Sequence, residues 1–415
     1  MQIRTMRTLA IAGAAFMGLA ACGGSSSGGT GSKGTVKIGI DLPLSGNETS
    51  NGVPTKNGAL FAIKQANDKG GVEGYKIDAV VLDDAVNGVH DPAQGAKNVQ
   101  QFVGDTGVLA MVGPFNSNVA RAEMPIASTA NLPMISPSNT GECLTQTHSY
   151  CANGEPASLH PGGKTNYFRV CTTDNIQGPA LADYAAKTLK KTKAYVLNDG
   201  ETYGAGLATN FSSQFTKDGG TVVANEHFDA KSTDDFKPFL NKAKAAGVDM
   251  IFFGGTDTNK GGIIRNQMKG ILSVPYMGGD GIQTDQFLKD ADGNSDGSYS
   301  SVAAVNADTL PAAKSFLDGF KAYKSLSTTD YGAYTANAYD ATNIIIQAIG
   351  SAIKANNGNV PSREAVRAAI GSVDYNGAIG HTTFDSNGDT SNKIISFYQV
   401  TGGKWNFVDQ ITFSG

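Results

Sequence analysis

A serine, a threonine and an aspartate, each in a loop after an apolar run, are the side chains best placed to bind charged groups. Ser117 follows VLAMVGP and precedes a helical pattern. We expect it at the helix N-cap, where its hydroxyl and nearby backbone N–H groups can receive a carboxylate or phosphate oxygen. Thr140 follows LPMISPS, and Asp280 lies in the glycine-rich turn MGGDG, where a carboxylate can meet a cation. Together the three predict a site for a zwitterion.

Each of these residues also has a purely structural interpretation. Ser117 can simply cap its helix, Thr140 can order the polar insertion that follows it, and Asp280 can be a solvated turn residue. Only the combination of the three favours ligand binding.

Motifs for catalysis and for metal binding are incomplete. SLHPGGKT has Ser158 where a phosphate-binding loop needs its first glycine, and DGNSDG is followed by Ala303 where a calcium loop needs glutamate. The five histidines show no spacing for zinc, and there is no G-x-S-x-G nucleophile elbow, which would have to stand between a strand and a helix. We therefore expect no enzyme activity, no cofactor and no metal site.

Apolar strand-like runs alternate with helical patterns along most of the chain. Continuous runs such as VLAMVGP and VDMIFFGG are typical of strands covered on both faces. The pattern predicts two doubly wound α/β lobes, with ligands bound beyond the carboxyl ends of the strands. An antiparallel hairpin is expected around Gly402 and Gly403. The expected helices are 56–68, 92–103, 118–129, 179–190, 206–217, 236–246 and 262–268.

Size and charge narrow the class of partner. The chain has 415 residues and a formal net charge of −4, without any block rich in lysine and arginine. Nucleic acid is excluded because its binding requires a basic surface. We expect small molecules or proteins as partners.

The N-terminus resembles that of a bacterial lipoprotein. Arg4 and Arg7 precede the apolar stretch 8–21, which is too short to span a bilayer core, since that needs about 20 residues. Residues 19–22, Leu-Ala-Ala-Cys, resemble a lipobox. The resemblance implies a signal peptide over 1–21, acylation of Cys22 by more than one chain, and a flexible Gly/Ser tether over 22–34. The protein would then be anchored to the outside of a membrane.

Three further cysteines lie in the part of the chain beyond the tether. Cys143 and Cys151 flank the short polar loop CLTQTHSYC, and an oxidising compartment favours a disulfide between them. Cys171 follows the strand-like run NYFRV and is expected to be a buried free thiol. The alternative is that Cys171 pairs with one of the other two.

Long stretches of the chain resemble the branched-chain amino acid binding proteins of bacterial ABC importers, which have the type I periplasmic binding protein fold. They include KIGIDLPLSG, MVGPFNSNVA, LPMISPSNT, FRVCTTDNIQGPALADY and YMGGDG. The resemblance implies two α/β lobes joined by three hinge crossings, here 35–172 plus 304–376 and 173–303 plus 377–415. It also implies a monomer that closes on an amino acid and delivers it to ABC permease subunits. The alternative is a tethered sensor that reports to a membrane receptor.

The resemblance also implies roles for individual residues. Ser117 and Thr140 would bind the α-carboxylate of the ligand, and the backbone carbonyl of Ser138 together with Asp280 would bind its ammonium group. The ligand side chain would be surrounded by residues at positions 51, 115, 116, 203, 256 and 334, here Asn51, Phe115, Asn116, Tyr203, Thr256 and Tyr334.

Two departures from the family pattern affect the expected ligand. Asn51 and Thr256 stand where aromatic residues are common in leucine-binding members, and Asp257 is a possible second acid nearby. Polar walls bury less apolar surface, so a polar amino acid fits the sequence as well as leucine does. The insertion 141–164 is also longer than the family loop.

Overall fold

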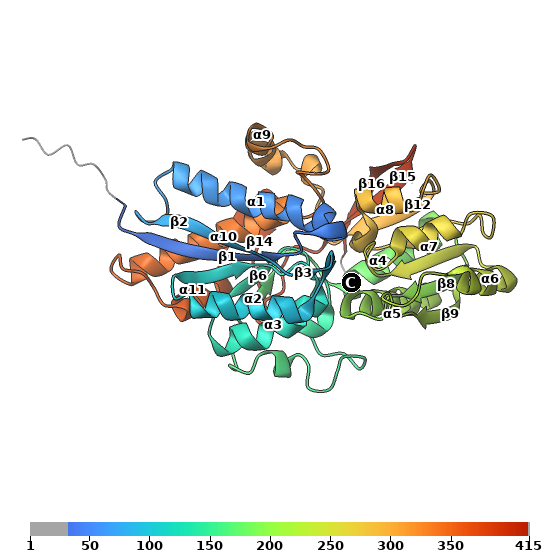
Figure 1. Ribbon diagram of the computed structural model, residues 1–415, viewed down its shortest axis with the longest axis horizontal. Coiled ribbons are helices and arrows are strands. Elements are labelled where there is room, and N and C mark those ends of the chain that lie inside the picture. Colours follow the sequence, from blue (N-terminus) through green and yellow to red (C-terminus); the bar gives the residue numbers. More distant parts are fainter. Residues whose placement is uncertain (1–31, 414–415) are drawn as a thin grey trace, which may run out of the picture. The chain divides into compact units, whose positions relative to one another are not determined.

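Two mainly parallel β-sheets hold the strands that alternate with helices along the chain. The computed structural model describes residues 32–413 (Figure 1), so the expected signal peptide 1–21, the lipidation site Cys22 and most of the tether 22–34 lie outside the described residues. The first sheet has the strand order β2-β1-β5-β6-β7, and all its neighbours are parallel. Its strands are β1 Thr35–Leu42, β2 Lys76–Asp83, β5 Val108–Val112, β6 Met134–Ser136 and β7 Tyr167–Arg169.

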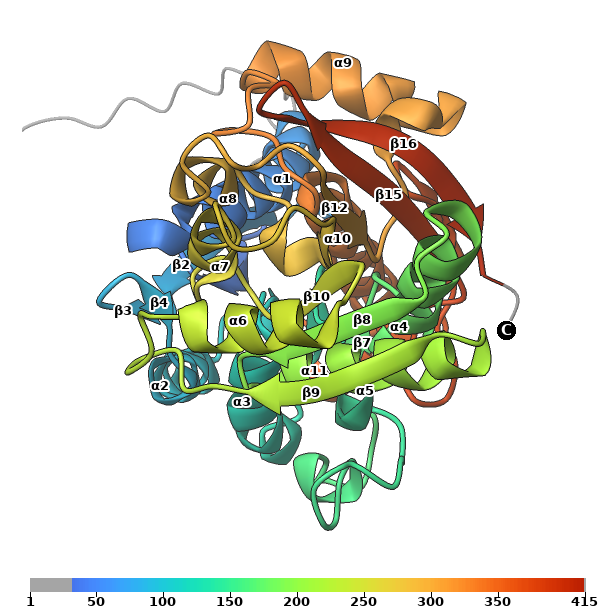
Figure 2. The same cartoon turned by 90° about the vertical axis from the view of Figure 1, so that its right-hand side faces the viewer.

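The second sheet has the order β16-β15-β12-β11-β10-β8-β9, seen in Figure 2. Its last two strands are antiparallel and join at Gly402 and Gly403, both with positive φ, as a tight hairpin turn requires. Its strands are β8 Lys193–Asn198, β9 Thr221–His227, β10 Met250–Gly254, β11 Tyr276–Gly278, β12 Ser298–Val302, β15 Ile394–Thr401 and β16 Lys404–Thr412. Two small ribbons pair β3 Ala85–Val86 with β4 Val89–His90, and β13 Tyr375–Gly377 with β14 Gly380–Thr382.

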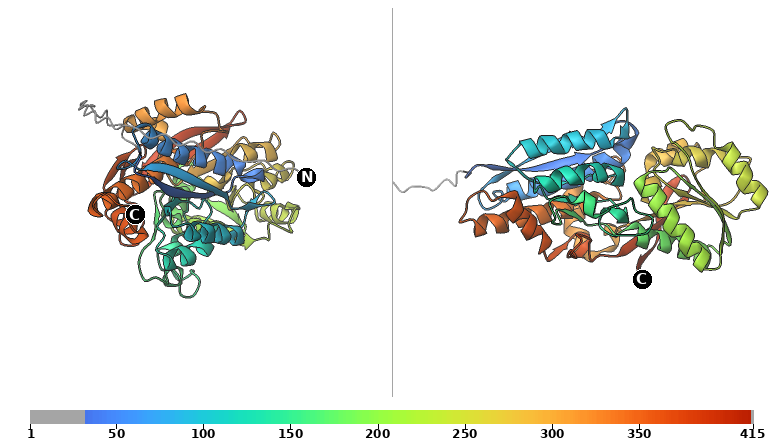
Figure 3. Two further views of the ribbon diagram at one scale, coloured as in Figure 1. Left: turned by 60° about the vertical axis from the view of Figure 1, so that its left-hand side comes forward. Right: turned by 90° about the horizontal axis from the view of Figure 1, so that it is seen from below.

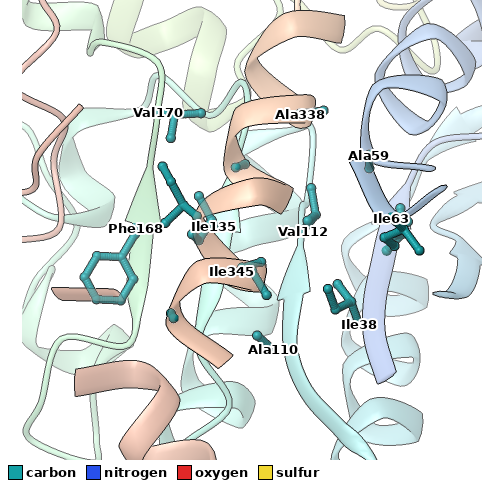
Figure 4. Packing of buried hydrophobic residues seen from close by; sticks show 14 of the residues in the cluster. Ile38, Ala59, Ile63, Ala110, Val112, Ile135, Phe168, Val170, Ala338 and Ile345 are labelled. Carbon is teal, nitrogen blue, oxygen red and sulfur yellow. The ribbon is translucent and has the colours of Figure 1, made fainter. Parts of the chain in front are cut away.

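Helices cover both faces of the first sheet. Helices α1 Thr49–Asp68, α10 Thr335–Ala355 and α11 Arg363–Gly371 enclose one apolar cluster, and Ile38, Val112, Ile135 and Ile345 pack together in it (Figure 4). Helices α2 Pro92–Gly104 and α3 Ser117–Thr129 enclose a second cluster on the opposite face. Helix α9 Lys314–Tyr323 packs its aromatic side chains against α1.

The second sheet is also covered on both faces, and β10 shows how its sequence achieves this. Met250 and Phe252 pack into the cluster under α4 and α5, whereas Ile251 and Phe253 pack into the cluster under α6 to α8. Alternate residues of a strand point to opposite faces, so an unbroken apolar run fills two cores. These helices are α4 Asp174–Asp183, α5 Thr202–Lys217, α6 Lys237–Ala246, α7 Gly261–Gln267 and α8 Asp285–Asp290.

The chain passes between the two sheets three times (Figure 3). The passages follow β7, β12 and α11, since α4 packs against α5 of the second sheet whereas α10 packs on β5 and β6 of the first. This is the expected architecture of two α/β lobes, each built on one sheet. Within residues 32–413 no helix is both long and apolar enough to cross a membrane.

Several helices begin earlier than the sequence pattern predicts. α1 begins at position 49 rather than 56, α4 at 174 rather than 179, and α5 at 202 rather than 206. α4 also ends at 183 and continues as one π-helical turn, Tyr184–Thr188. Gly52 and Gly178 lie in the added turns, and each serves close packing. A Cβ on Gly52 would lie 1.7 Å from the Pro43 carbonyl oxygen, and one on Gly178 would lie 2.6 Å from Cβ of Asn210.

Candidate ligand-binding site

Two loops of the first lobe are held together by the expected site residues. β5 and β6 are parallel neighbours, so the loops after them emerge at the same edge of the sheet. Ser117 Oγ accepts the N–H of Gly141 at 3.1 Å, and Ser138 Oγ donates to the carbonyl of Phe115 at 2.9 Å. Ser117, Ser138 and Thr140 are all buried. The structure therefore brings these hydroxyl groups to one wall.

Ser117 is not the N-cap of its helix, and that prediction was wrong. It is the first residue of α3, and the extended residue before it, Asn116, occupies the N-cap position. The hydroxyl of Ser117 instead holds the loop that carries Thr140. The backbone of Ser117 is already helical, so the helix starts one residue earlier than predicted. The residue type of Ser117 does not determine whether it caps the helix or begins it.

Asp280 begins a short 3-10 turn, Asp280–Ile282, after β11 of the second lobe. One carboxylate oxygen, Oδ1, accepts hydrogen bonds from Gln177 Nε2 at 2.7 Å and from the Tyr203 hydroxyl at 3.1 Å. Burial raises the pKa of Asp280, and these two hydrogen bonds oppose the rise only in part. A buried carboxylate with a raised pKa gains from a cationic partner.

Aromatic residues from both lobes surround Asp280. Tyr334 meets Phe115 edge to face, with ring centroids 5.7 Å apart. Burial first, and then the nearby Asp280 carboxylate, raises the pKa of the Tyr334 hydroxyl well above its ordinary value. Gly281 lets Tyr203 and Thr256 pack against the turn that begins at Asp280, since a Cβ on Gly281 would lie 3.0 Å from Tyr203 Cε1 and from Thr256 Cα. Phe115, Tyr203, Thr256 and Tyr334 are therefore gathered where the lobes meet.

Asn51 is less closely connected to the other expected residues. It lies half-buried in the first turn of α1, where its carbonyl accepts the Thr55 hydroxyl at 2.8 Å. Across residues 32–413 no hydrogen bond joins Asn51 to Ser117, Thr140 or Asp280.

Several buried polar atoms at this site have no partner of regular hydrogen-bond geometry among the described residues. They include Thr140 Oγ1, both carboxylate oxygens of Asp174, Gln177 Oε1, Asn116 Oδ1, Glu48 Oε2, Glu142 Oε2 and the Tyr334 hydroxyl. Asp174 and Thr140 are close enough for the Thr140 hydroxyl to lower the pKa of Asp174, yet burial and the Glu142 carboxylate raise it overall. An unsatisfied buried polar group costs about 1 to 3 kcal/mol, so the set favours a polar solute as the missing partner.

A chain of buried hydrogen bonds joins the lobes on one side of the site. His90 Nδ1 lies 2.6 Å from Glu48 Oε1, and His90 Nε2 lies 2.8 Å from Glu201 Oε2 in the second lobe. Thr258 Oγ1, also in the second lobe, donates to Glu48 Oε1 at 2.7 Å. Burial alone would lower the pKa of His90, but the charge of Glu48 and the bonds to both carboxylates raise it well above 6.5. His90 is therefore held as a cation between two acids.

The polar insertion joins the lobes on the other side. Cys143 and Cys151 form a disulfide, and Cys171 is a buried free thiol, as expected. Tyr150 donates to Glu142 Oε1, which also accepts from Asn210 Nδ2 of α5 at 2.7 Å. A cavity of about 400 Å³ lies between the insertion and the start of α5.

Asp257, the possible second acid, has a structural role. Its Oδ1 accepts the N–H of Gly262 at 2.9 Å in the first turn of α7. Burial first, and then the charge of Asp290, raises the pKa of Asp257 to about 8. In residues 32–413 no three His, Cys, Asp or Glu side chains are arranged to hold a metal ion.

Five residues near the candidate site were not predicted from the sequence: Gln177, Asp174, Glu48, His90 and Glu142. Gln177 and Asp174 lie in TTDNIQGP, directly after a predicted strand, and that position was the available signal. Glu48 and His90 carried no signal, because they meet only through the tertiary fold.

The chain matches proteins of known family over nearly its whole described length. The family model "Periplasmic binding protein" matches residues 35–404. The Leu/Ile/Val-binding protein BraC3 of Rhizobium johnstonii is 29% identical, over 97% of this chain and 99% of that protein. The Leu/Ile/Val-binding protein homolog 3 of Brucella melitensis is 30% identical, over 89% of this chain and 92% of that protein.

Solved structures give the same result. The leucine binding protein LivK of Thermotoga maritima has a TM-score of 0.77 and 26% identity, covering 91% of this chain and 99% of that one. The branched-chain amino acid transporter substrate binding protein LivJ of Streptococcus pneumoniae, solved with isoleucine, has a TM-score of 0.74 and 26% identity over 90% and 99% of the two chains. With its two α/β lobes and the match over residues 35–404, this chain belongs to the periplasmic binding protein family.

Proposed function

We propose that this protein captures an α-amino acid outside the cytoplasm and delivers it to the permease of an ABC importer. One observation carries the proposal: buried hydroxyls of the first lobe and the buried Asp280 carboxylate of the second lobe lie where the lobes meet, with Thr140 Oγ1 unpartnered. The arrangement suits the two opposite charges of an amino acid. The names of the relatives, among them the isoleucine-bound LivJ, support the same class of ligand.

In this proposal Ser117 and Thr140 bind the α-carboxylate, and Asp280 with the carbonyl of Ser138 binds the ammonium group. Burying both charges is tolerable only when each is paired and hydrogen-bonded. Six residues surround the ligand side chain: Asn51, Phe115, Asn116, Tyr203, Thr256 and Tyr334.

Lobe closure follows from the same arrangement. Because the two charges of the ligand contact different lobes, the ligand binds the closed form more tightly than the open one. A difference of about 5.5 kcal/mol would shift the population from 1:99 to 99:1. We assign residues 35–172 plus 304–376 to the first lobe and 173–303 plus 377–415 to the second, and we expect a monomer.

A thermal-shift screen over the amino acids tests the function. A ligand present at about 100 times its Kd stabilises the folded protein by about 2.7 kcal/mol. For a protein of this size the melting temperature should then rise by about 3 °C. If no amino acid raises it at millimolar concentration, the proposed function is wrong.

The lipid anchor is a separate part of the proposal. The lipobox-like residues 19–22 lead us to propose that Cys22 is acylated after removal of residues 1–21, with 22–34 as the tether. Changing Cys22→Ala should move the protein from the membrane fraction to the soluble fraction of the cell envelope. Changing Cys171→Ala, at the buried thiol, is the matched control and should leave it in the membrane fraction. Equal fractionation of the Cys22 variant and the unchanged protein would contradict the anchor.

A further inference from the structure

Asn116 occupies a helix N-cap but does not cap the helix. Its backbone is extended, with φ −97° and ψ 139°, and asparagine is among the preferred N-cap residues. At the same position of α2, Asp91 Oδ1 accepts the N–H of Gln94 at 2.8 Å. Asn116 makes no such bond, although it is only 7% exposed, and its Oδ1 has no partner among the described residues. This buried acceptor is therefore available to a ligand.

Asn116 lies within the group of residues that would contact a ligand. It stands between Phe115, which packs against Tyr334, and Ser117, whose hydroxyl holds the Thr140 loop. Tyr334 in turn faces Asp280. The free acceptor is thus on the wall that would surround the ligand side chain.

The facing wall from the second lobe is also polar. Thr256 Oγ1 lies 2.9 Å from Thr258 Oγ1 and accepts the N–H of Asn259 at 3.3 Å. Thr258 donates to Glu48 Oε1, and the second oxygen of that buried carboxylate, Oε2, makes no bond of regular geometry in the described part of the chain. Both free acceptors, Asn116 Oδ1 and Glu48 Oε2, come from the first lobe. The Tyr334 hydroxyl also has no partner of regular geometry among residues 32–413, but it is directed at the Asp280 carboxylate.

We infer that the captured amino acid carries a hydrogen-bond donor, an O–H or N–H group, on its side chain; this rests on the proposed function. An aliphatic side chain of the same size would leave the buried acceptors without partners, and such a site rejects ligands that lack the donor. Hydroxyl, carboxamide and amino side chains supply the donor that these acceptors lack, whereas valine and leucine do not.

Matched ligand pairs test the inference by calorimetry on the whole protein at neutral pH. The pairs are threonine with valine, asparagine with leucine, and lysine with norleucine, each similar in size but different in donors. We expect the ligand with the highest affinity to be the polar member of one pair, and the apolar member of that pair to bind about tenfold or more weakly. In Asn116→Leu, the affinities of the two members of that pair should come within about threefold of each other.

Asn118→Leu is the matched control, because Asn118 lies on the same helix but lines the cavity beside the insertion. It should keep the preference for the polar member, and circular dichroism should show both variants folded. Tightest binding of valine, leucine or norleucine by the unchanged protein would overturn the inference and leave the proposed function standing. Binding of none of the six would contradict the inference, and it would contradict the proposed function as well only if no other amino acid binds in the thermal-shift screen.

Discussion

Replacing Asp280 with alanine should weaken binding of the captured amino acid by about 3 to 5 kcal/mol, a factor of more than one hundred in Kd. Asp280 is buried, and its Oδ1 is already fixed by Gln177 and Tyr203. Without the carboxylate, a ligand ammonium would be buried with no compensating charge. Calorimetry with the ligand found in the screen measures the effect directly.

Two controls make this result specific. Asp318→Ala removes a carboxylate exposed on α9 and should leave the affinity unchanged. Asp280→Asn keeps the shape but not the charge, so it should lose most of the same affinity. If Asp280→Asn binds as tightly as the unchanged protein, Asp280 does not bind an ammonium group.

The affinity should also fall on acidification because of Asp280. Burial raises its pKa above the ordinary 3.8, so in the ligand-free protein the carboxylate takes up a proton at a higher pH than a surface aspartate does. Ligand binding must then displace that proton, which weakens binding as the pH falls. The Asp280→Asn variant, which cannot titrate there, should lose this part of the pH dependence.

Replacing Arg169 with methionine should lower the free energy of unfolding by about 3 to 5 kcal/mol. Arg169 is fully buried where β7 leads into the first passage between the lobes. Its Nε donates to Asp389 at 2.6 Å, and its Nη1 donates to the carbonyls of Asn139 and Gly141 at 3.0 and 2.8 Å. Methionine fills the space but leaves the Asp389 carboxylate without its cationic partner, with only Thr145 and Gln146 still donating to it, and removes the guanidinium donor of both carbonyls.

The free energies of unfolding of three variants, measured by chemical denaturation, separate the contribution of the buried charges from that of side-chain packing. Lys164→Met removes the exposed pair with Glu364 and should cost less than about 1 kcal/mol. The double variant Arg169→Met, Asp389→Leu removes both charges and should be more stable than Arg169→Met alone. A change within about 1 kcal/mol for Arg169→Met would contradict the assigned role of the ion pair.

Acidification should destabilise the folded protein by protonating Asp389 of the Arg169–Asp389 ion pair. Burial alone would raise the pKa of Asp389, but the charge of Arg169 and the hydrogen bonds of Gln146 and Thr145 lower it overall. Because the pKa of Asp389 is lower in the folded protein than in the unfolded chain, the ionised carboxylate stabilises the folded protein at pH values above the unfolded-state pKa. This stabilisation is lost as the pH falls through the folded-state pKa.

The sequence alone predicted the two α/β lobes, and it proposed a candidate site at the ends of their strands. Unbroken apolar runs such as 250–253 predict strands buried on both faces, because neighbouring side chains of a strand face opposite cores. Strand-end loops then predict Ser117 and Thr140 at the ends of neighbouring strands of the first sheet and Asp280 at the end of a strand of the second. The short loop between Cys143 and Cys151 favours their pairing for a local reason, the small entropy of closing it.

Other features depended on contacts between distant segments. Gly52 and Gly178 lie inside helices where a neighbouring segment, at Pro43 and at Asn210, comes too close for a side chain, which no local pattern reveals. The His90 contacts with Glu48 and Glu201 join residues 42 and 111 positions apart. Asn116 had the residue type of an N-cap, and only the packed loops show that its acceptor is left free. Local sequence determines periodicity and turn chemistry, whereas the tertiary structure decides which polar atoms are buried together and which of them lack a partner.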